Sequence, residues 1–328
     1  MFKIGMDLKQ VKLFLGDDWA RFEREVSSVL NSDTELLNAI NERIINNGGK
    51  QLRPLLCLLS ARACGKVTDL SIDCAVTSEL IHTATLLHDD VADNSPLRRG
   101  VPTIMSLFGP SVSVLVGDYW LSKAIALLVG NAGDGIILAF SRSLEELAHG
   151  EILQLQKASE CDTTMEDYLK IISCKTAALF KAAMVSGAYS VNAPQEYLEA
   201  VSGYAENLGL AFQMKDDIFD YTPQLNVGKK LGVDILEQKI TLPLIEALKR
   251  SGGQDNARIR DMVRRIREDE SLKDEIVAFV EASDGVTHAK ETLISYSEKA
   301  VSCLDALPRT PEKEILEELA MYMADRDI

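Results

Sequence analysis

Apolar residues recur every three or four positions along almost the whole chain, which is the period of an amphipathic α-helix. In the stretch 76–93, for example, Val76, Leu80, Leu87 and Val91 follow this spacing. The same period predicts further helices over residues 9–30, 34–47, 51–63, 109–129, 134–157, 175–190, 195–221, 240–250, 255–268, 286–305 and 312–325. No run alternates between apolar and polar residues as a half-buried strand does. The pattern therefore predicts an all-α fold of about a dozen helices.

The breaks between these helices contain residues that favour turns. They are Gly48-Gly49, Asn94-Ser95-Pro96, Asn131-Ala132-Gly133, Thr222-Pro223 and Ser251-Gly252-Gly253. None of these breaks resembles a linker between domains, and no segment repeats with the period of a solenoid. We therefore predict a single domain, residues 1–328, built as a helical bundle.

The most apolar stretch, residues 112–129, contains Asp118 and Lys123. Charges inside the stretch favour a buried core helix over a membrane span. The N-terminal segment MFKIGMDLKQVKLFLGDDW is interrupted by charge and lacks the apolar centre of a signal peptide. The sequence therefore predicts no membrane anchor.

Charge and cysteine content narrow the class of protein further. The formal net charge of −15 argues against nucleic acid as a partner, because nucleic acid phosphates favour basic surfaces. It leaves room for a phosphorylated substrate, since a few cations and metal ions can reverse the sign of the charge locally. The cysteines show neither a CxxC motif nor metal-ligand spacing; they are Cys57, Cys64, Cys74, Cys161, Cys174 and Cys303. We expect reduced, mostly buried thiols in a cytoplasmic protein.

Two aspartate clusters with the same spacing close two of the apolar helices. They are Asp89-Asp90-Val91-Ala92-Asp93 and Asp216-Asp217-Ile218-Phe219-Asp220. On a helix the first and last aspartate of each cluster lie about 40° apart around the axis, so both carboxylates project from one face. Like charges repel, and the carboxyl end of a helix is already partly negative. A divalent cation offsets both effects, and magnesium suits carboxylates and substrate phosphates best. The clusters therefore predict a paired magnesium site.

Basic residues lie at turns near these clusters. Lys50 and Arg53 follow Gly48-Gly49 at a helix start, where free backbone N–H groups also favour anions. Arg98 and Arg99 leave the first cluster directly. Further along the chain are Lys175, and then Lys229, Lys230 and Lys239 after the second cluster. Arginine suits bidentate phosphate contacts and lysine acts as a point charge, so these positions predict binding of diphosphate.

These residues, with the segments around them, resemble the trans-isoprenyl diphosphate synthases (polyprenyl synthetases). From about residue 46 to residue 248 the family's segments appear in the family's order: GGKQLRP, LLHDDVADNSPLRRGVPT, GDYWLSKA, GEILQL, KTAALF, FQMKDDIFD and GKKLGVDILEQKITLPLI. The resemblance implies an isoprenoid-synthase-like helical bundle around a central cavity, usually as a homodimer. It also implies two substrates, isopentenyl diphosphate and an allylic diphosphate such as farnesyl diphosphate.

The resemblance also implies roles for individual residues. Three magnesium ions are expected, held by Asp89 and Asp93 with assistance from Asp90, and by Asp216, Asp217 and Asp220. The isopentenyl diphosphate pocket is expected to contain Lys50, Arg53, His82 and Arg99. The allylic diphosphate is expected to contact Arg98, Lys175, Thr176, Gln213, Lys229 and Lys239. Two positions depart from the family: Gln238 replaces a common glycine, which puts the local turn in doubt, and Asn94 replaces an acidic residue.

A mechanism follows from these roles. Metal ions and cations stabilise the charge that builds on the leaving diphosphate, so that the allylic C–O bond ionises. An apolar cavity protects the carbocation from water. The isopentenyl double bond attacks C1, and a proton is then lost to the departing diphosphate. We find no Ser-His-Asp or Cys-His set, and the reaction requires no side-chain nucleophile.

Product length is expected to depend on the residues one turn before Asp89, which are Ala84 and Thr85. Both are small, and in the family a bulky aromatic residue there is the device that stops growth at short chains. The hypothesis is a product between hexaprenyl and decaprenyl, with octaprenyl favoured. The alternatives are that the small residues only allow close helix packing, and that the enzyme is a short-chain (farnesyl or geranylgeranyl) diphosphate synthase.

Three other functions remain open at this point. Glu79 with His82, and Glu146 with His149, form ExxH pairs of the kind used by di-iron helical bundles. A terpene cyclase shares an aspartate-rich first cluster, but its second metal motif usually mixes Asn or Asp with Ser or Thr and Glu, unlike the all-aspartate second cluster. An inactive partner subunit of a prenyl synthase would be expected to have lost aspartates or cations, and none is missing.

Overall fold

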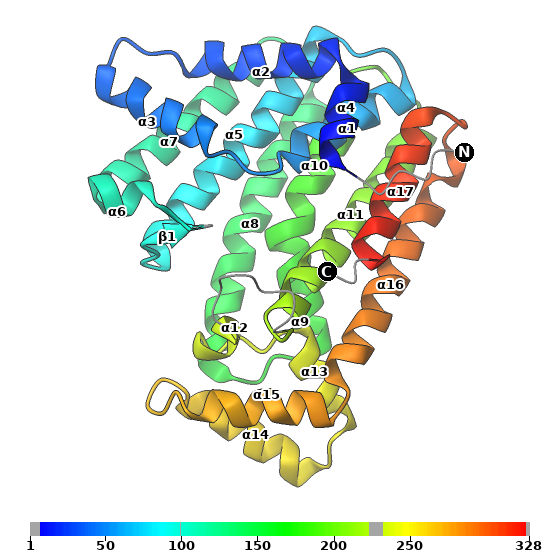
Figure 1. The fold of residues 1–328 in the computed structure, drawn as a ribbon. Helices are drawn as coiled ribbons and strands as arrows, with labels where there is room; N and C mark the ends of the chain where they lie inside the picture. The colour runs from blue at the N-terminus through cyan, green and yellow to red at the C-terminus, as the bar shows by residue number, and fades with distance from the viewer. Residues whose placement is uncertain (1–6, 99, 223–231, 326–328) are drawn as a thin grey trace. The chain divides into compact units, whose positions relative to one another are not determined.

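The structure is a computed structural model that describes residues 7–98, 100–222 and 232–325 (Figure 1). In this part of the chain almost all regular structure is helical, which confirms the predicted all-α class. The exception is a small antiparallel hairpin of β1 (Leu97–Arg98) and β2 (Val101–Pro102).

The chain forms two compact units. The first unit comprises residues 1–141, 182–201 and 307–315, and the second comprises residues 142–181, 202–306 and 316–328. The single domain expected over residues 1–328 stays a prediction.

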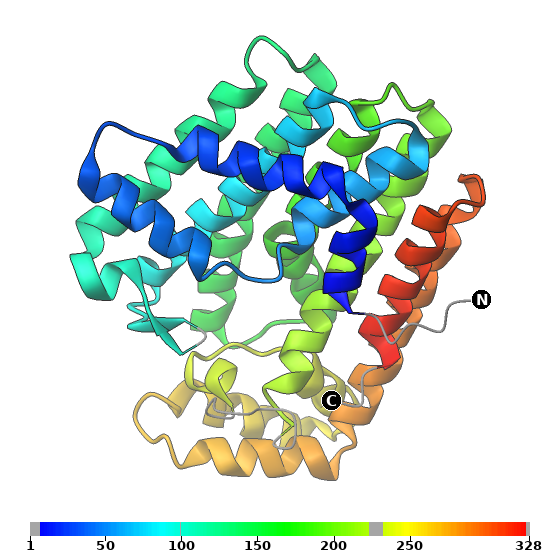
Figure 2. The same ribbon diagram turned by 45° about the horizontal axis from the view of Figure 1, so that its top comes forward.

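The first unit is built on α4, α5 and α7. Its helices are α1 (Leu8–Leu15), α2 (Asp17–Leu30), α3 (Glu35–Asn46), α4 (Leu52–Cys64), α5 (Asp69–Ala92), α6 (Ile104–Phe108) and α7 (Pro110–Leu128), with the first turns of α8 (Asp134–Glu160), most of α10 (Ala178–Tyr189) and the first turns of α11 (Gln195–Phe219) and α17 (Pro311–Asp325). Most of α4 is buried, and α5 lies along α7 in both views (Figures 1 and 2). Close approach is possible because Gly117 of α7 has no Cβ, which would lie 2.3 Å from His88 Nε2. The end of α5 is thereby packed tightly against α7.

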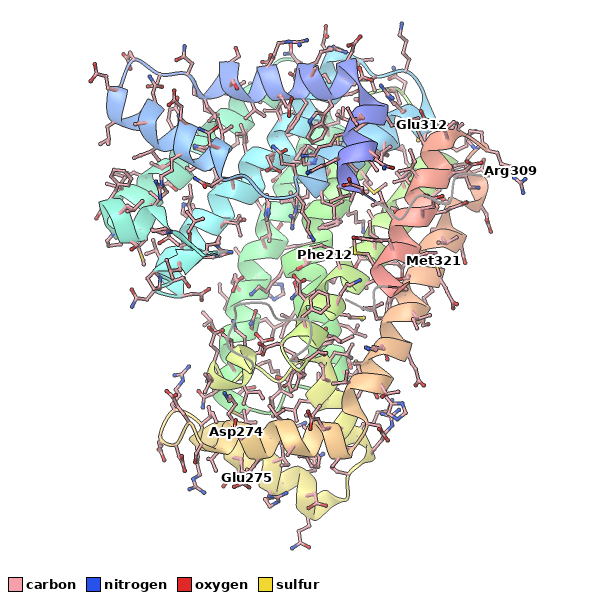
Figure 3. The ribbon with its side chains drawn as sticks, viewed as in Figure 1. Phe212, Asp274, Glu275, Arg309, Glu312 and Met321 are labelled. Atoms are coloured by element: carbon pink, nitrogen blue, oxygen red, sulfur yellow. The ribbon has the colours of Figure 1, made fainter. Side chains whose placement is uncertain are left out.

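The second unit contains the remaining helices around a core of its own. They are most of α8, α9 (Met165–Ile172), the π-helical segment η1 (Ser173–Ala177), the start of α10 (Ala178–Tyr189), most of α11 (Gln195–Phe219), α12 (Val233–Leu236), α13 (Leu242–Arg250), α14 (Gly253–Arg265), α15 (Leu272–Ala282), α16 (Gly285–Cys303), the 3-10 segment η3 (Leu304–Ala306) and most of α17 (Pro311–Asp325). Met214, Leu244 and Val280 are among the residues of its core. The acidic first turn of α15, with Asp274 and Glu275, is exposed (Figure 3).

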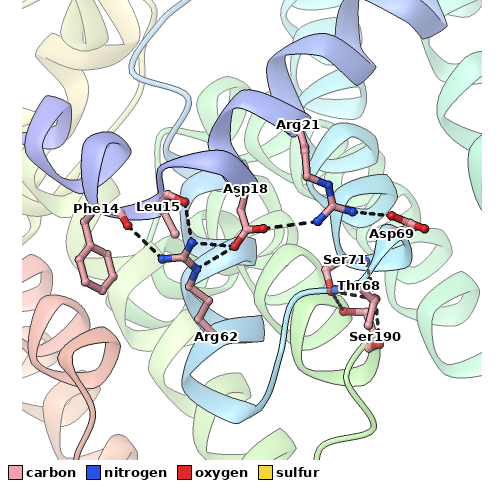
Figure 4. A network of polar contacts seen from close by, with 9 residues as sticks. All are labelled: Phe14, Leu15, Asp18, Arg21, Arg62, Thr68, Asp69, Ser71 and Ser190. Carbon is pink, nitrogen blue, oxygen red and sulfur yellow. Dashed lines mark hydrogen bonds and ion pairs between the residues drawn. The ribbon is translucent and has the colours of Figure 1, made fainter.

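Several element boundaries differ from those that the periodicity predicts. The expected helix 9–30 is divided at Gly16, whose φ of 53° ends α1 and begins α2. The helix expected from residue 76 begins at Asp69, because Thr68 accepts a hydrogen bond from the Ser71 backbone N–H and completes a capping box (Figure 4). Lys175 does not open a helix, since it lies inside η1 between α9 and α10.

The elements that the sequence did not predict are mostly short. They are α6, α9, α12, α15 and the hairpin. Elements of this length span too few turns to show a clear apolar period. A capping box at Thr164 and Asp167 marks the start of α9 and was the one local signal that could have identified it.

The expectation that residues 112–129 form a buried core helix is wrong. Among the described residues, two helical stretches are long and apolar enough to cross a membrane by length and composition, Pro110–Leu128 and Met165–Tyr189. The second is 78% buried within the protein, but the first is only 33% buried. Periodicity identified a helix here but could not tell which side of it the rest of the chain covers. The result is a largely uncovered apolar face on α7.

The six cysteines are all in the described residues, and all are free thiols. Four are buried and two, Cys64 and Cys303, are partly exposed. Burial raises the pKa of each of these thiols above its ordinary value. A raised pKa favours the protonated thiol, which is the less nucleophilic form.

Candidate active site

The first aspartate cluster lies at the carboxyl end of α5. Asp89 and Asp90 belong to the last turn, and Asp93 is the C-cap residue with its N–H bonded to the carbonyl of Asp89 at 2.8 Å. The three carboxylates differ in environment: Asp90 is buried, Asp89 is half-buried and Asp93 is exposed. The expected termination of a helix at this cluster is confirmed.

Arg98 returns to this helix end through the hairpin that follows it. Asn94 takes a φ of 48°, and Gly100 takes a φ of 78° in the turn between β1 and β2. The Arg98 Nε then donates to Asp90 Oδ1 at 2.8 Å. Burial raises the pKa of Asp90, and the bond and charge of Arg98 oppose that rise. In this structure Arg98 therefore neutralises the middle carboxylate of the cluster. Arg99 lies outside the described residues.

The residues expected to bind isopentenyl diphosphate lie on α4, α5 and the turn before α4. Lys50 is exposed, and Arg53 and His82 are half-buried. Burial of the guanidinium lowers the pKa of Arg53 to about 10, and the nearby Glu79 opposes that shift. A buried Glu79 thus balances the charge of Arg53, which gives this member of an ExxH pair a structural role.

The second aspartate cluster closes α11, and its middle residue is again the buried one. Asp216 is exposed, Asp217 is buried and Asp220 is half-buried just past the last turn. Asp217 accepts hydrogen bonds from Gln213 Nε2 at 2.9 Å and from the Tyr168 hydroxyl at 2.7 Å. Because both carboxylate oxygens have a donor, Asp217 is held in one orientation.

Asp220 makes a different set of contacts. Its Oδ1 and Oδ2 accept from the backbone N–H groups of Val233 and Asp234, at 3.1 and 3.0 Å. Asp220 therefore caps the first turn of α12 and ties this short helix to the end of α11. The cap also brings the side chain of Asp234 into the acidic group.

A cavity of about 140 Å³ lies beside this cluster, entirely within the second unit. Its lining includes Tyr168, Lys175, Gln213, Asp217, Asp234 and Lys239. Burial, with the charges of neighbouring aspartates, raises the pKa of both Asp217 and Asp234. Lys239 opposes the rise for Asp234. Carboxylates crowded in a confined, partly cationic cavity are suited to a divalent cation with a phosphate ligand.

The cations of this cavity are held by acidic or amide partners. Lys175 Nζ lies 2.6 Å from Glu151 Oε1 and also donates to Gln154. Lys239 pairs with Glu237. The Thr176 hydroxyl donates to Gln213 Oε1 at 2.7 Å, so that Thr176 and Gln213 form one chain of hydrogen bonds that ends on Asp217.

The unusual Gln238 does not disturb the turn before Lys239. Gln238 has a φ of 63°, the left-handed conformation that a glycine would adopt at little cost. Its side-chain amide donates to the Arg264 carbonyl at 2.9 Å. A side-chain bond thus supports the backbone conformation, and Lys239 still lines the cavity. Lys229 and Lys230 lie outside the described residues.

Sequence reasoning overlooked two groups at this site. The prediction for the segment that contains Asp234 named only its lysines. An acidic residue shortly after an aspartate cluster is a signal that could have been used. Tyr168 lies on α9, 49 residues before its hydrogen-bond acceptor Asp217, and nothing in its local sequence indicates that role. Its position follows only from tertiary packing.

Within the described ranges, no three or more His, Cys, Asp or Glu side chains are already arranged as a metal-binding group. This holds for the aspartate clusters and for both ExxH pairs. For magnesium the finding is compatible with the donors present, since that ion keeps several waters and takes only a few carboxylates besides substrate phosphates. Iron in a di-iron bundle instead requires a converging set of protein ligands, which the described residues lack.

Helices that end in carboxylate clusters, with lysines beside one of them, are typical of enzymes that bind phosphorylated substrates through divalent cations. The family model for polyprenyl synthetase matches residues 34–280. The chain therefore belongs to the polyprenyl synthetase family and is an enzyme that transfers prenyl groups.

Relatives and solved structures extend the similarity over the whole chain. An all-trans-nonaprenyl-diphosphate synthase (geranyl-diphosphate specific) of Rhodobacter capsulatus is 36% identical, over 98% of this chain and 99% of the relative. The octaprenyl diphosphate synthase of Escherichia coli is 33% identical, over 98% of this chain and 100% of the relative. A polyprenyl synthase from Caulobacter crescentus, crystallised with calcium and isoprenyl diphosphate, superimposes with a TM-score of 0.90 at 34% identity, with 100% of both chains covered. These matches confirm the predicted helical-bundle fold and the resemblance.

A first prediction concerns the hydrogen bond from Tyr168 to Asp217. In Tyr168→Phe we expect the free energy of unfolding to fall by about 1–2 kcal/mol, because a buried carboxylate loses one of its donors. From the sequence-based expectation that Asp217 binds magnesium, we also expect the magnesium concentration for half-maximal activity to rise about tenfold, because loss of a residue that orients a metal ligand has an effect of this size. Urea unfolding and a magnesium titration of prenyl transfer measure the two effects. Tyr189→Phe, at an exposed position, is the matched control. Equal effects of both variants would contradict the role given to the hydrogen bond from Tyr168 to Asp217.

Proposed function

We propose that this chain is a long-chain all-trans-polyprenyl diphosphate synthase. It condenses isopentenyl diphosphate with an allylic diphosphate such as farnesyl diphosphate, head to tail, and releases diphosphate. The observation that carries the proposal is the near full-length similarity to enzymes named for octaprenyl and nonaprenyl products. The product is a chain between hexaprenyl and decaprenyl, with octaprenyl favoured. The reaction takes place in the cytoplasm.

The aspartates of each cluster are proposed to bind metal ions. Asp89, Asp93, Asp216, Asp217 and Asp220 would hold magnesium ions, three in number, with Asp90 assisting. Bound magnesium would neutralise the developing charge of the leaving diphosphate. The crowding of Asp217 and Asp234 in one cavity supports this proposal, since the carboxylates need a counter-charge there.

The protein's own cations would bind the diphosphate groups directly. Lys175, with Thr176 and Gln213 beside it, and Lys239 line the cavity next to Asp217. Arg98 holds Asp90 through Nε, and a guanidinium has further N–H groups with which to meet a phosphate oxygen. Lys229 is proposed for the same substrate. Lys50, Arg53, His82 and Arg99 are proposed to bind isopentenyl diphosphate, whose double bond attacks C1 of the allylic partner.

The direct test is incubation of the purified protein with labelled isopentenyl diphosphate, farnesyl diphosphate and magnesium. We expect one long prenyl alcohol as the main product after dephosphorylation, and no product when EDTA removes the metal. Resolving the alcohols by chain length gives the product size. Failure to incorporate label with any allylic starter would overturn the synthase proposal in favour of an inactive subunit. A hydrocarbon product would favour a cyclase.

Product length is proposed to depend on the turn of α5 below Asp89. Ala84 is fully buried, whereas Thr85 is half-buried and lies four residues before Asp89. Residues four apart share a helix face, so the Thr85 side chain lies beneath the Asp89 carboxylate. Thr85 is therefore the stronger of the two positions proposed to set chain length.

We expect Thr85→Phe to shorten the main product by several isoprene units, because an aromatic ring on this face would block the growing chain. Ala84→Phe should shorten it as well, with a loss of stability from overpacking of about 1–3 kcal/mol. Thr83→Phe makes the same change on nearly the opposite face of α5 and should leave product length unaltered. If all three variants released the wild-type product, the proposed floor of the tunnel would be refuted.

A homodimer is the proposed assembly, and the uncovered face of α7 supports it. Leu115, Ile125 and Val129 are 66%, 55% and 66% exposed. Ile137 and Leu138, in the first turns of α8, are also exposed apolar residues of the first unit. An apolar face of this extent is characteristic of an interface with another chain, and we propose that a second copy covers it.

The double variant Leu115→Glu/Ile125→Glu is expected to be a monomer, because two carboxylates would have to be buried without partners in the interface. Light scattering after size-exclusion chromatography measures the mass. Leu36→Glu places the same charge on an exposed apolar position of α3 and should remain a dimer. A dimeric Leu115→Glu/Ile125→Glu variant would show that the interface lies elsewhere.

A further inference from the structure

Helix α1 reaches the turn from which the proposed isopentenyl diphosphate ligands extend. The Lys12 ammonium donates to Gln51 Oε1 at 2.8 Å. Gln51 lies directly after Lys50 and two residues before Arg53. The two partners are 39 residues apart in sequence, so the bond joins the start of the chain to this turn within the first unit.

Gln51 is a residue whose backbone needs support. Its φ and ψ are 54° and 45°, the left-handed region that residues with a Cβ rarely adopt. Gln51 is also the N-cap residue of α4, but its side chain makes no capping hydrogen bond. The side chain is directed to Lys12 instead. This bond therefore stabilises a turn that the local sequence would not hold by itself.

Lys12 is fixed in place by several neighbours. Its ammonium lies 4.4 Å from the centroid of the Trp19 ring. Trp19 is buried, and its indole N–H donates to Glu23 Oε1 at 2.9 Å. Burial lowers the pKa of Lys12, and the charges of Glu23 and Glu79 oppose that shift. A charge that is half-buried and held on several sides is poorly explained as a solvated surface lysine.

Glu79 connects Lys12 electrostatically with Arg53. It acts on Arg53 in the same sense as on Lys12, opposing the pKa shift that burial causes. One buried carboxylate of α5 thus lies close enough to influence both cations. Loss of Lys12 would remove one of the two cations near Glu79, in addition to releasing Gln51.

The far end of α1 is anchored independently of Lys12. Arg62, in the last turn of α4, donates to the backbone carbonyls of Phe14 and Leu15 and to Asp18 (Figure 4). Because this group of bonds holds α1 against α4, removal of Lys12 alone would not detach the helix. The contact of Lys12 with Gln51 can therefore be tested without unfolding the N-terminal region.

We propose that Lys12 is a positioning residue for isopentenyl diphosphate: through Gln51 it fixes the turn that orients Lys50 and Arg53. The inference rests on the proposed function, which assigns these two cations to that substrate. Lys12 acts through its neighbours and contacts no reacting atom. Its loss should therefore weaken the binding of one substrate and spare the chemical step and the other substrate.

The test uses steady-state kinetics of the full-length enzyme. In Lys12→Met, which keeps the length of the stem, we expect the KM for isopentenyl diphosphate to rise about tenfold. The kcat and the KM for farnesyl diphosphate should stay within about twofold of wild type. Lys12→Arg, which keeps a charged donor, should recover most of the loss. Lys9→Met changes an exposed lysine of the same helix and should behave as wild type.

A second substitution separates positioning from a general effect on stability. Gln51→Gly allows the left-handed backbone without a side chain to hold. Adding Lys12→Met to Gln51→Gly should therefore change the KM for isopentenyl diphosphate by less than about twofold. An undiminished tenfold effect in this background would overturn the proposed route through Gln51. If Lys12→Met fails to fold, Lys12→Leu, which also lacks a donor, replaces it with the same expected direction.

Lys50→Met distinguishes the failure of this inference from the failure of the pocket assignment. If Lys50→Met raises the KM for isopentenyl diphosphate but Lys12→Met does not, the positioning role is wrong and the pocket stands. If neither variant changes that KM, both the pocket assignment and the inference fail. Equal rises in the KM values of both substrates after Lys12→Met would show a general structural role and would also overturn the proposal.

Discussion

The constraint on which the candidate site depends is negative charge held at the carboxyl ends of two long apolar helices. A helix end of this kind is already partly negative, yet α5 and α11 each finish in aspartates with a buried middle residue. The protein compensates each buried carboxylate locally. Arg98 donates a hydrogen bond to Asp90, and Tyr168 and Gln213 each donate one to Asp217. Asp93 and Asp216 are exposed, so each helix end also carries an acidic side chain at the surface.

Much of the fold was predictable because its long helices bury one apolar face, and a period of three to four residues records that burial. The termination of α5 and α11 at the aspartate clusters followed from the turn residues after them. The short elements could not be predicted, since α6 and α12 span one turn or little more. The exposure of α7 could not be predicted either, because the sequence pattern of an apolar face does not depend on whether its own chain or another copy covers it.

The residue types of the candidate site were predictable from the sequence, and their partners were not. The aspartates, Lys175, Thr176 and Gln213 stand in motifs that mark them. The hydrogen bonds that orient them come from other elements, such as α9 for the Tyr168 hydroxyl and the first turn of α12 for the Asp234 backbone N–H. Gln238 is a further residue whose stabilising partner could not be predicted from the sequence. Its departure from glycine put the local turn in doubt, but a hydrogen bond to the Arg264 carbonyl supports its left-handed backbone.

The π-helical segment η1 fixes the rotation, about the helix axis, of the residues before it relative to the residues after it. A π turn contains an extra residue relative to an α turn, and each residue of an α-helix advances about 100° around the axis. Tyr168 lies before η1, whereas Thr176 lies within it, and both connect to Asp217, directly or through Gln213. Removal of one residue from Ser173–Ala177 would restore an unbroken α-helix but turn Tyr168 away from its carboxylate. The π-helical segment therefore keeps the hydroxyl donors of Tyr168 and Thr176 oriented toward their acceptors.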